Sequence, residues 1–268
     1  RQGGAGWHKQ FRAAWEGGKQ NDVARAFHRQ VFRHQEMKQL GQTPPKDEFI
    51  EQYVAQLNKM NDELFDARIS ANIKGFSIDR RVKNYVPHIW KKAKVTEIIK
   101  KFGRQAVLDV LTESIESAKR HGRIADNKST SELAESQLNW INGTGDSLEH
   151  IGEVGKGSSA RGKSRIPLDF TVEKNGLSML DLIDTDLPTV MDSYVQRAGA
   201  DVGISQASNG LIRSEGDFEK FLTPDSDADK LLVQDVKDIL YGRPTRGGMP
   251  PEMRAMMDMV TLQQMGGI

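Results

Sequence analysis

The stretch Gly176-Leu-Ser-Met-Leu-Asp-Leu-Ile-Asp-Thr-Asp-Leu-Pro-Thr-Val-Met-Asp-Ser-Tyr-Val195 decides how the chain folds, because a turn, a short strand and a capped helix follow one another in it. The Asn175-Gly176 turn and the apolar run 177–180 predict the second half of a β-hairpin. Pro188 stands in the first turn of a helix, where its missing N–H costs nothing. One apolar face of that helix follows a 3.6-residue period through Val190, Met191, Tyr194 and Val195.

The residues on either side of the Asn175-Gly176 turn complete this pattern. Ile166 to Val172 alternates apolar and polar side chains, which predicts the first strand of the hairpin. Asp181, Asp184 and Asp186 come directly before the helix. Carboxylates at that place are stabilised by the helix dipole, so we interpret them as capping residues. A divalent-metal site is the alternative. Arg197 and Asp201, four residues apart, are spaced for a surface salt bridge.

The net charge of +1 conceals an uneven distribution along the chain. Residues 74–104 hold ten Lys or Arg against two acids, a net charge of +8, whereas residues 167–241 hold fifteen acids against six bases, a net charge of −9. Charge complementarity, within one chain or between subunits, is the first interpretation. A nucleic-acid face is the second. The residues that would make DNA or subunit contacts are Lys91, Lys92, Lys94, Lys100, Lys101 and Arg104.

Helical periodicity dominates the remainder of the chain. An amphipathic stripe through Val23, Phe27 and Val31 predicts a helix in the first forty residues, and a long helix is predicted from Asp47 to about residue 73. Further helices are expected at 94–120 with a break at Gly103, and at 129–142, 218–222, 231–241 and 252–265. Residues 84–90 read as an extended connector, because Pro87 disfavours helix at the residue before it. His88 reads as a packed connector histidine, with a phosphate contact as the alternative.

Several motifs that suggest chemistry lack the context they need. The run Gly157-Ser-Ser-Ala-Arg-Gly-Lys-Ser164 matches a phosphate-binding loop by its letters, but the β-type run 166–168 that follows does not open the required helix. Glu135-Ser136 resembles the catalytic acid of lytic transglycosylases, but the later Gly-Leu-Met-Gln element is missing. The acids from Asp225 to Asp229 begin like a calcium loop that lacks its glycine and its final glutamate. We therefore expect no catalytic, metal or cofactor site in this segment.

Composition and pattern together predict a mainly α protein with one small β-hairpin and a long Gly-rich loop. The charged share of 28% is ordinary for a soluble protein, the absence of cysteine excludes disulfides, and no apolar run is long enough to span a membrane. The expected divisions are an N-terminal helical segment 1–44, a helical domain 45–142 with the basic connector, the Gly-rich loop 143–165, and the hairpin with C-terminal helices 166–268. The first residue is Arg1, and we read the chain as a segment of a longer protein.

Three short motifs, in order along the chain, carry a family resemblance. They are Tyr85-Val-Pro87-His88, then Asp181-Leu-x-Asp184-x-Asp186 with Met191-x-x-Tyr194-x-x-Arg197-x-x-x-Asp201-x-x-Ile204, and finally Leu240-x-Gly242-Arg243. In these residues the chain resembles the largest internal virion protein of short-tailed bacteriophages. The resemblance covers residues 45–268, and residues 1–44 agree only in helical character.

This resemblance implies a structural role rather than catalysis. Proteins of this kind form part of the internal core of the virion and are ejected into the host with the genome. The expectation is then a homo-oligomeric ring in the core, released at infection to help form a conduit for DNA across the host cell envelope and periplasm. Its partners would be other core and ejection proteins and, through the basic stretch, the phage DNA. A lytic transglycosylase domain would lie elsewhere in the full-length protein.

Overall fold

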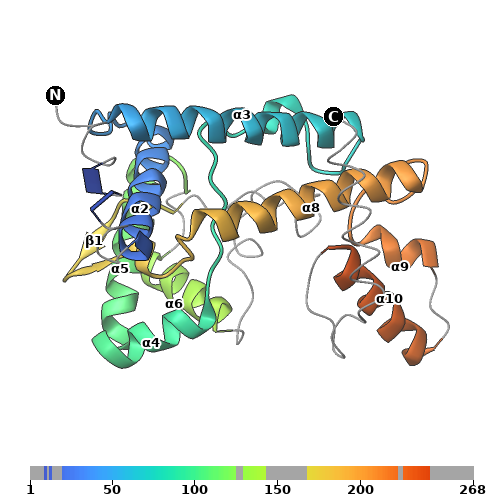
Figure 1. The fold of residues 1–268 in the computed structure, drawn as a ribbon. Helices are drawn as coiled ribbons and strands as arrows, with labels where there is room; N and C mark the ends of the chain where they lie inside the picture. The colour runs from blue at the N-terminus through green and yellow to red at the C-terminus, as the bar shows by residue number, and fades with distance from the viewer. Residues whose placement is uncertain are drawn as a thin grey trace.

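The computed structural model describes residues 9–10, 12–13, 20–124, 129–142, 168–222 and 226–241. Over these residues the protein is mainly helical with one two-stranded antiparallel sheet, as the sequence predicts (Figure 1). The Gly-rich loop expected at 143–165 and the helix expected at 252–265 lie outside the described residues. The helices are α2 (Gln20–Gln39), α3 (Glu48–Ser70), α4 (Lys92–Phe102), α5 (Arg104–Arg120), α6 (Thr130–Ile141), α8 (Leu187–Ala207), α9 (Asp217–Leu222) and α10 (Asp227–Leu240).

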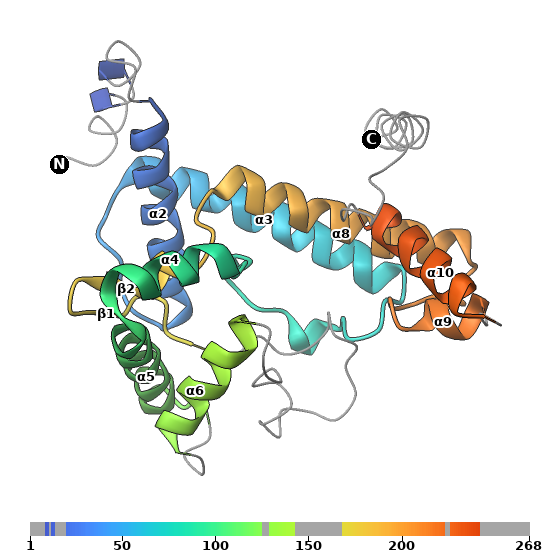
Figure 2. The same cartoon turned by 90° about the horizontal axis from the view of Figure 1, so that it is seen from below.

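The two long helices α3 and α8 lie side by side and run in the same direction (Figures 1 and 2). Asp47 begins α3, since its side chain accepts hydrogen bonds from the backbone N–H groups of Phe49 and Ile50, both at 3.1 Å. With 23 residues, α3 is about 35 Å long at 1.5 Å per residue. The pair joins the two ends of the molecule, with α2, α4, α5 and α6 at one end and α9 and α10 at the other (Figure 1).

The predicted break in the helix at 94–120 is confirmed at Gly103. This residue ends α4 and begins α5 with a φ of +87°, in the left-handed region that favours glycine. The N–H of Gly103 still donates to the carbonyl of Ile99 at 2.9 Å, so α4 closes with a regular hydrogen bond before the chain turns.

The hairpin is present but shorter than predicted. Strand β1 (Glu173–Lys174) pairs with β2 (Leu177–Ser178), and Asn175 and Gly176 both have positive φ in the turn. The prediction of a first strand over 166–172 is wrong for the described residues 168–172. There the side chain of Asp169 accepts hydrogen bonds from the N–H and the hydroxyl of Thr171, at 2.8 and 2.6 Å, and bends the chain into an Asx turn.

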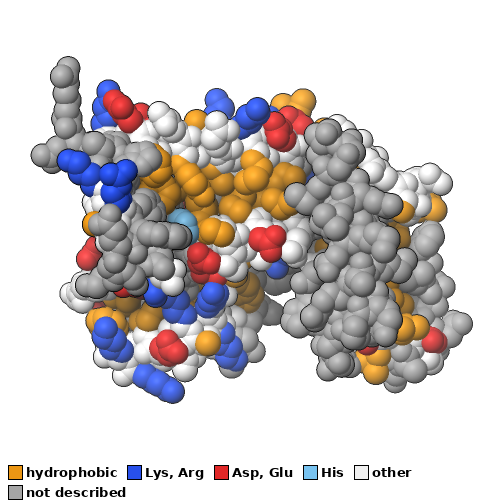
Figure 3. All heavy atoms as spheres, viewed as in Figure 1, with side chains coloured by type: hydrophobic (Ala, Val, Ile, Leu, Met, Phe, Trp, Pro, Cys, Tyr) orange, Lys and Arg blue, Asp and Glu red, His pale blue; other side chains and the backbone are white. Residues whose placement is uncertain are grey.

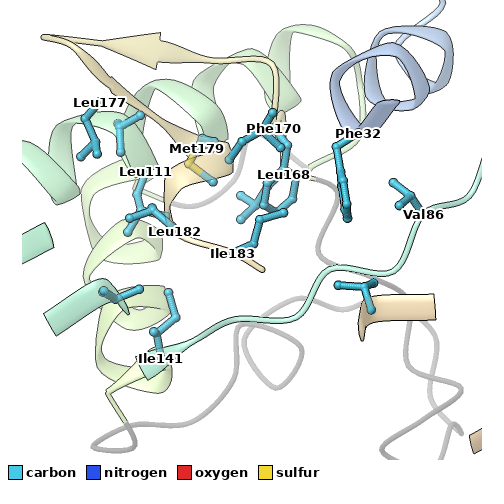
Figure 4. Close-up of a cluster of buried hydrophobic side chains, with 14 of the residues drawn as sticks. Phe32, Val86, Leu111, Ile141, Leu168, Phe170, Leu177, Met179, Leu182 and Ile183 are labelled. Carbon is cyan, nitrogen blue, oxygen red and sulfur yellow. The ribbon is translucent and has the colours of Figure 1, made fainter. Parts of the chain in front are cut away.

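One hydrophobic core unites most of the elements. It contains apolar side chains of α2, α3, α4, α5 and α6, together with residues of the segment 168–191 (Figure 4). Helix α5 lies deepest, because Val107, Val110, Leu111 and Ile115 are completely buried. Segments placed in three different predicted divisions therefore share this core. A second, smaller cluster holds Ile212, Phe218 and Tyr241 at the end formed by α9 and α10.

Residues 81–91, called here the connector, link the 3-10 turn η1 (Ile78–Arg80) to α4 (Figure 2). The connector makes polar contacts with both long N-terminal helices. Asn61 of α3 donates to the carbonyl of Tyr85 at 2.6 Å, and Gln39 of α2 donates to the carbonyl of Asn84 at 2.6 Å. This extended segment is consequently tied to the helices on both sides, as the sequence predicts for a connector.

Candidate functional site

The first and second sequence motifs meet in space at a joint between the connector and residues 181–186, called here the acidic turn. The N–H of Asp184 donates to the carbonyl of Ile89 at 2.7 Å, and Trp90 forms an isolated antiparallel bridge with Ile183. Lys91 Nζ lies 2.6 Å from Asp184 Oδ2. Asp184 of the second motif is thus bonded to Ile89 and Lys91, which lie just after the first motif in the sequence and more than ninety positions before Asp184.

The aromatic members of the motifs pack at the same joint. The rings of Tyr85 and Tyr194 lie 5.5 Å apart between centroids, and burial raises the pKa of Tyr194. Pro87 is buried. The ring of His88 lies against Phe170 with centroids 3.7 Å apart, and its Nε2 is 2.9 Å from Glu36 Oε1 of α2. His88 is therefore a packed connector histidine, the first of its two interpretations.

Asp201 of the second motif pairs across the two long helices. Its Oδ2 accepts a hydrogen bond from Arg68 Nε at 3.2 Å, and both side chains are 4% exposed. The Arg68 guanidinium also lies over two rings, 4.8 Å from the centroid of Phe76 and 4.9 Å from that of Tyr194. Arg197, the partner that the sequence pattern suggests for Asp201, is exposed on α8.

Each acid of the acidic turn faces a basic or imidazole side chain. Asp181 Oδ1 is 2.5 Å from Arg29 Nη1, and Asp186 Oδ1 is 3.5 Å from His28 Nδ1, both on α2. With Lys91 at Asp184, the three carboxylates contact side chains from two different segments, α2 and the connector. Within the described residues, no group of three side chains is arranged to hold a metal ion.

The capping prediction for these acids is met in part. Asp181 and Ser178 form a reciprocal capping box around the 3-10 turn η2 (Met179–Asp181). Asp184 Oδ1 accepts from the N–H of Asp186 at 3.0 Å. Asp186 occupies the N-cap position of α8 but accepts from the Thr189 hydroxyl instead of a backbone N–H. The turn is therefore held by side-chain bonds as well as by the helix dipole.

The six basic residues predicted to contact DNA or another subunit divide into two sets. Lys91 pairs with Asp184, Lys94 Nζ donates to the carbonyl of Ile183 at 2.8 Å, and Arg104 forms a two-pronged ion pair with Glu135. The second set is exposed on α4, and no described acidic side chain lies within 4 Å of any of its members. These are Lys92, Lys100 and Lys101.

Ion pairs inside the chain also join the basic and acidic stretches. Lys74 Nζ lies 2.5 Å from Asp217 Oδ1, in addition to the Lys91–Asp184 pair. Burial lowers the pKa of Lys94, with further lowering from the nearby charges of Arg29 and Lys91, while Asp181 and Asp184 oppose the shift. Part of the predicted charge complementarity is therefore intramolecular.

Two motifs that the sequence analysis compared with catalytic and calcium-binding patterns fall wholly or partly in the described residues, where their side chains make other contacts. Hydrogen bonds from Arg104 lower the pKa of Glu135. A general acid that works at neutral pH requires the opposite, a raised pKa. Asp229 forms a capping box with Ser226 at the start of α10. The stretch 157–164, which matches a phosphate-binding loop by its letters, lies outside the described residues.

Sequence reasoning missed the partners on α2 and α3. Arg29, Glu36 and Arg68 each pair with a motif residue more than fifty positions away. One signal was present for Glu36 and Arg68. Glu36 follows the apolar Phe32 by four residues, and Arg68 follows Leu64 by four, so each lies on the apolar face of its own helix. A charged side chain on such a face is buried only when it has a partner.

No family model and no curated protein matches this chain. Among the described residues, no helix combines the length and the apolar character needed to cross a membrane.

Proposed function

We propose that this chain is a structural segment of an internal core and ejection protein of a short-tailed bacteriophage. In this proposal it oligomerises in the virion core and then helps to form the conduit that carries the genome across the host cell envelope. The proposal starts from the three ordered motifs. Its carrying observation is that His88, Asp184 and Asp201 of the first two motifs are buried side chains that pair with other parts of the same chain.

That placement suits a scaffold better than a catalyst. Asp184, Asp201 and His88 are buried or half-buried, and each contacts an oppositely charged or titratable side chain, Lys91, Arg68 and Glu36 respectively. Such pairs define how helices and connector fit together, and removing one member leaves a buried charge without its partner. Residues used in this way need no substrate to account for their presence.

Exposed apolar side chains support the oligomeric part of the proposal. Apolar atoms gather along the junction of α3 and α8 on the face shown in Figure 3. Exposed apolar side chains of these helices include Tyr53 of α3 at 36% and Val195 of α8 at 38%. Large apolar groups exposed along two packed helices favour a protein partner. In the proposed ring, this face and the lysines of α4 are available for contact between subunits.

A second candidate function is binding of nucleic acid by α4. The observation that favours it is the set of three exposed lysines, Lys92, Lys100 and Lys101, without an acidic neighbour among the described residues. If all three contact phosphates of duplex DNA, the logarithm of affinity falls with the logarithm of salt concentration with a slope of about −3.

One experiment tests both candidates: sedimentation velocity at low and moderate salt, with and without duplex DNA. The proposed core protein forms a large oligomer without DNA. A monomer that changes its sedimentation only when DNA is added contradicts the first candidate and supports the second.

The variant Lys92→Glu/Lys100→Glu/Lys101→Glu tests whether the positive charge of α4 is needed for the oligomer. Its matched control, Lys46→Glu/Lys59→Glu/Lys220→Glu, makes the same change in net charge at exposed positions outside α4. Loss of the oligomer in the α4 variant alone places the subunit contact at α4. Equal oligomers in both variants and the unsubstituted chain exclude α4 from the contact. Lys91 and Lys94 are left intact because they hold the internal joint.

A further inference from the structure

Helix α2 carries an unusual share of the histidines. Of the four histidines in the described part of the chain, His28 and His34 belong to α2, and His88 of the connector contacts α2 through Glu36. The fourth, His121, donates a hydrogen bond from Nδ1 to the carbonyl of Ser117 at the end of α5. The seam where α2 meets the remainder of the protein therefore holds three of the four histidines in the described part of the chain.

His34 is buried without a partner for one nitrogen. The residue is 4% exposed, and its Nε2 makes no hydrogen bond. Burial lowers the pKa of His34, and the charge of Lys38 on the same helix lowers it further. Asp47 and Glu51, at the start of α3, oppose this shift but do not reverse it. The docked form of α2 consequently favours a neutral His34.

His28 lies on the same seam, six residues earlier in α2. Its side chain is 12% exposed and faces Asp186 at the start of α8, with 3.5 Å between Nδ1 and Oδ1. Burial lowers the pKa of His28, and Asp186 offsets only part of that effect. Protonation of either His28 or His34 therefore disfavours the docked form of α2, although the two side chains face different elements.

Two pairs of ionisable side chains help to keep α2 docked, together with hydrogen bonds from Gln35 to Asn58, from Gln39 to the carbonyl of Asn84 and from Arg123 to the carbonyl of Gln39. Arg29 pairs with Asp181 at 2.5 Å, and Glu36 Oε1 lies 2.9 Å from His88 Nε2. A proton on His88 strengthens its attraction to the Glu36 carboxylate, so this second contact opposes release. The apolar side of the helix, Phe27, Val31 and Phe32, is also buried in the main core. Helix α2 is therefore released only when the free energy gained by protonating His28 and His34 exceeds the free energy of these contacts.

We propose that α2 is an acid-released clamp: protons taken up by His28 and His34 are accommodated when α2 lifts from α3, the connector and the acidic turn and uncovers Phe27, Val31 and Phe32. The chain then changes from a closed form to one with a detached N-terminal helix and an open apolar surface. This device does not depend on the function proposed above.

The direction follows from proton linkage. Both imidazoles have a lower pKa in the docked form than the value near 6.5 of a free histidine, so docking loses stability as pH falls below about 6.5. For each histidine, the ratio of open to closed molecules rises about tenfold per pH unit until the docked pKa is reached. Above that range both side chains are neutral in both forms, and pH has no effect through them.

Hydrogen exchange of the whole chain at pH 7.5 and 5.5, corrected for the intrinsic exchange rate, tests the clamp. The expected result is a loss of protection of about tenfold or more in the amides of α2, with the amides of α5 from Val107 to Ala118 unchanged. Equal protection of α2 at both pH values overturns the proposal. So does a parallel loss in α2 and α5, which is global acid unfolding.

The double variant His28→Gln/His34→Gln removes both protonation sites while keeping polar side chains. Its α2 protection is expected to be the same at both pH values, whereas His121→Gln, the matched control, keeps the pH dependence of the unsubstituted chain. A double variant that still loses protection in acid overturns the proposal. If the double variant does not fold, hydrogen exchange at the imidazole C2 carbon of the unsubstituted chain measures the pKa of His28 and His34 directly. Titration of His28 and His34 at or above pH 6.5 then overturns the clamp.

Discussion

Buried charged side chains that pair with one another are the main feature at the scale of residues. Arg68 and Asp201 are each 4% exposed and bond to one another, with two aromatic rings beside the guanidinium. Isolated, such a charge is too costly to bury. Their positions in α3 and α8 therefore determine each other, and the pair sets the register of the two long helices.

Asp201→Ala should lower the free energy of unfolding by about 3–5 kcal/mol, because it leaves the Arg68 guanidinium buried without its carboxylate. The matched control is Glu63→Ala, which removes the exposed Lys59–Glu63 pair on α3, 3.9 Å apart. We expect less than about 1 kcal/mol from that change. Urea denaturation measures both, and similar midpoint shifts for the two variants would contradict the role given to Asp201.

Asp217 offers a test of pH dependence. Burial acts to raise its pKa, but bonds from Lys74 Nζ, Ser214 Oγ and the N–H of Arg213 outweigh burial, and the pKa is lowered. A carboxylate with a lowered pKa stabilises the folded form above its unfolded pKa of about 3.9 and loses that effect as pH falls through the folded value.

Asp217→Asn should therefore be less stable than the unsubstituted chain at pH 6. The difference should shrink below about pH 4, where the acid of the unsubstituted chain becomes protonated. Chemical denaturation at a series of pH values follows this difference. If the difference in unfolding free energy between the two chains stays constant from pH 6 to pH 3, the stabilisation by Asp217 does not depend on its negative charge.

At the scale of elements, local signals and tertiary contacts cooperate to begin and end helices. Asp47 begins α3, a capping box begins α10, and Gly103 separates α4 from α5. These signals act on their own neighbours, so the sequence predicts them well. The acidic turn is different, because Asp181, Asp184 and Asp186 also contact Arg29, Lys91 and His28 from elsewhere in the chain.

Two glycines with opposite roles make a matched pair of variants. Gly103→Ala introduces a side chain at a φ of +87° and should cost about 1–2 kcal/mol, although no atom lies within 4 Å of the new Cβ. Gly199→Ala, in the exposed face of helix α8 and equally free of contacts, should raise stability by up to about 1 kcal/mol. Thermal unfolding compares them, and shifts of the same sign would refute the conformational argument.

At the scale of the whole molecule, two cores of unequal size lie at the ends of the α3–α8 pair. The large core contains side chains from α2 to α6 and the segment 168–191, whereas the small one contains Ile212, Phe218 and Tyr241. Because fewer apolar contacts hold α9 and α10, that end should open first.

Phe218→Ala should unfold the small end without unfolding the large one. The ring of Phe218 is 4% exposed and packs at an angle on Tyr241, 6.4 Å away between centroids. Its loss should cost about 3–5 kcal/mol at that end. Hydrogen exchange should show faster exchange in α10 and no change in α5. Equal acceleration in both helices would mean that the two cores unfold together.

The sequence by itself determined the helical class, the hairpin turn, the break at Gly103 and the extended connector. Each depends on side-chain spacing or on the backbone preferences of glycine, proline and capping residues, which act over a few neighbours. Local reasoning was less reliable at Asp169, where a side-chain turn displaced the expected strand.

Only the tertiary structure decided which charges meet. The sequence shows a basic and an acidic stretch, but not that Lys91 and Lys74 pair internally while Lys92, Lys100 and Lys101 remain exposed. It places three ordered motifs along the chain, but not that α2 and α3 supply Arg29, Glu36 and Arg68 as partners for the first two. These ion pairs join segments that are far apart in the sequence and come together only when the helices pack. The spacing of residues along the chain does not show which of these segments will be neighbours.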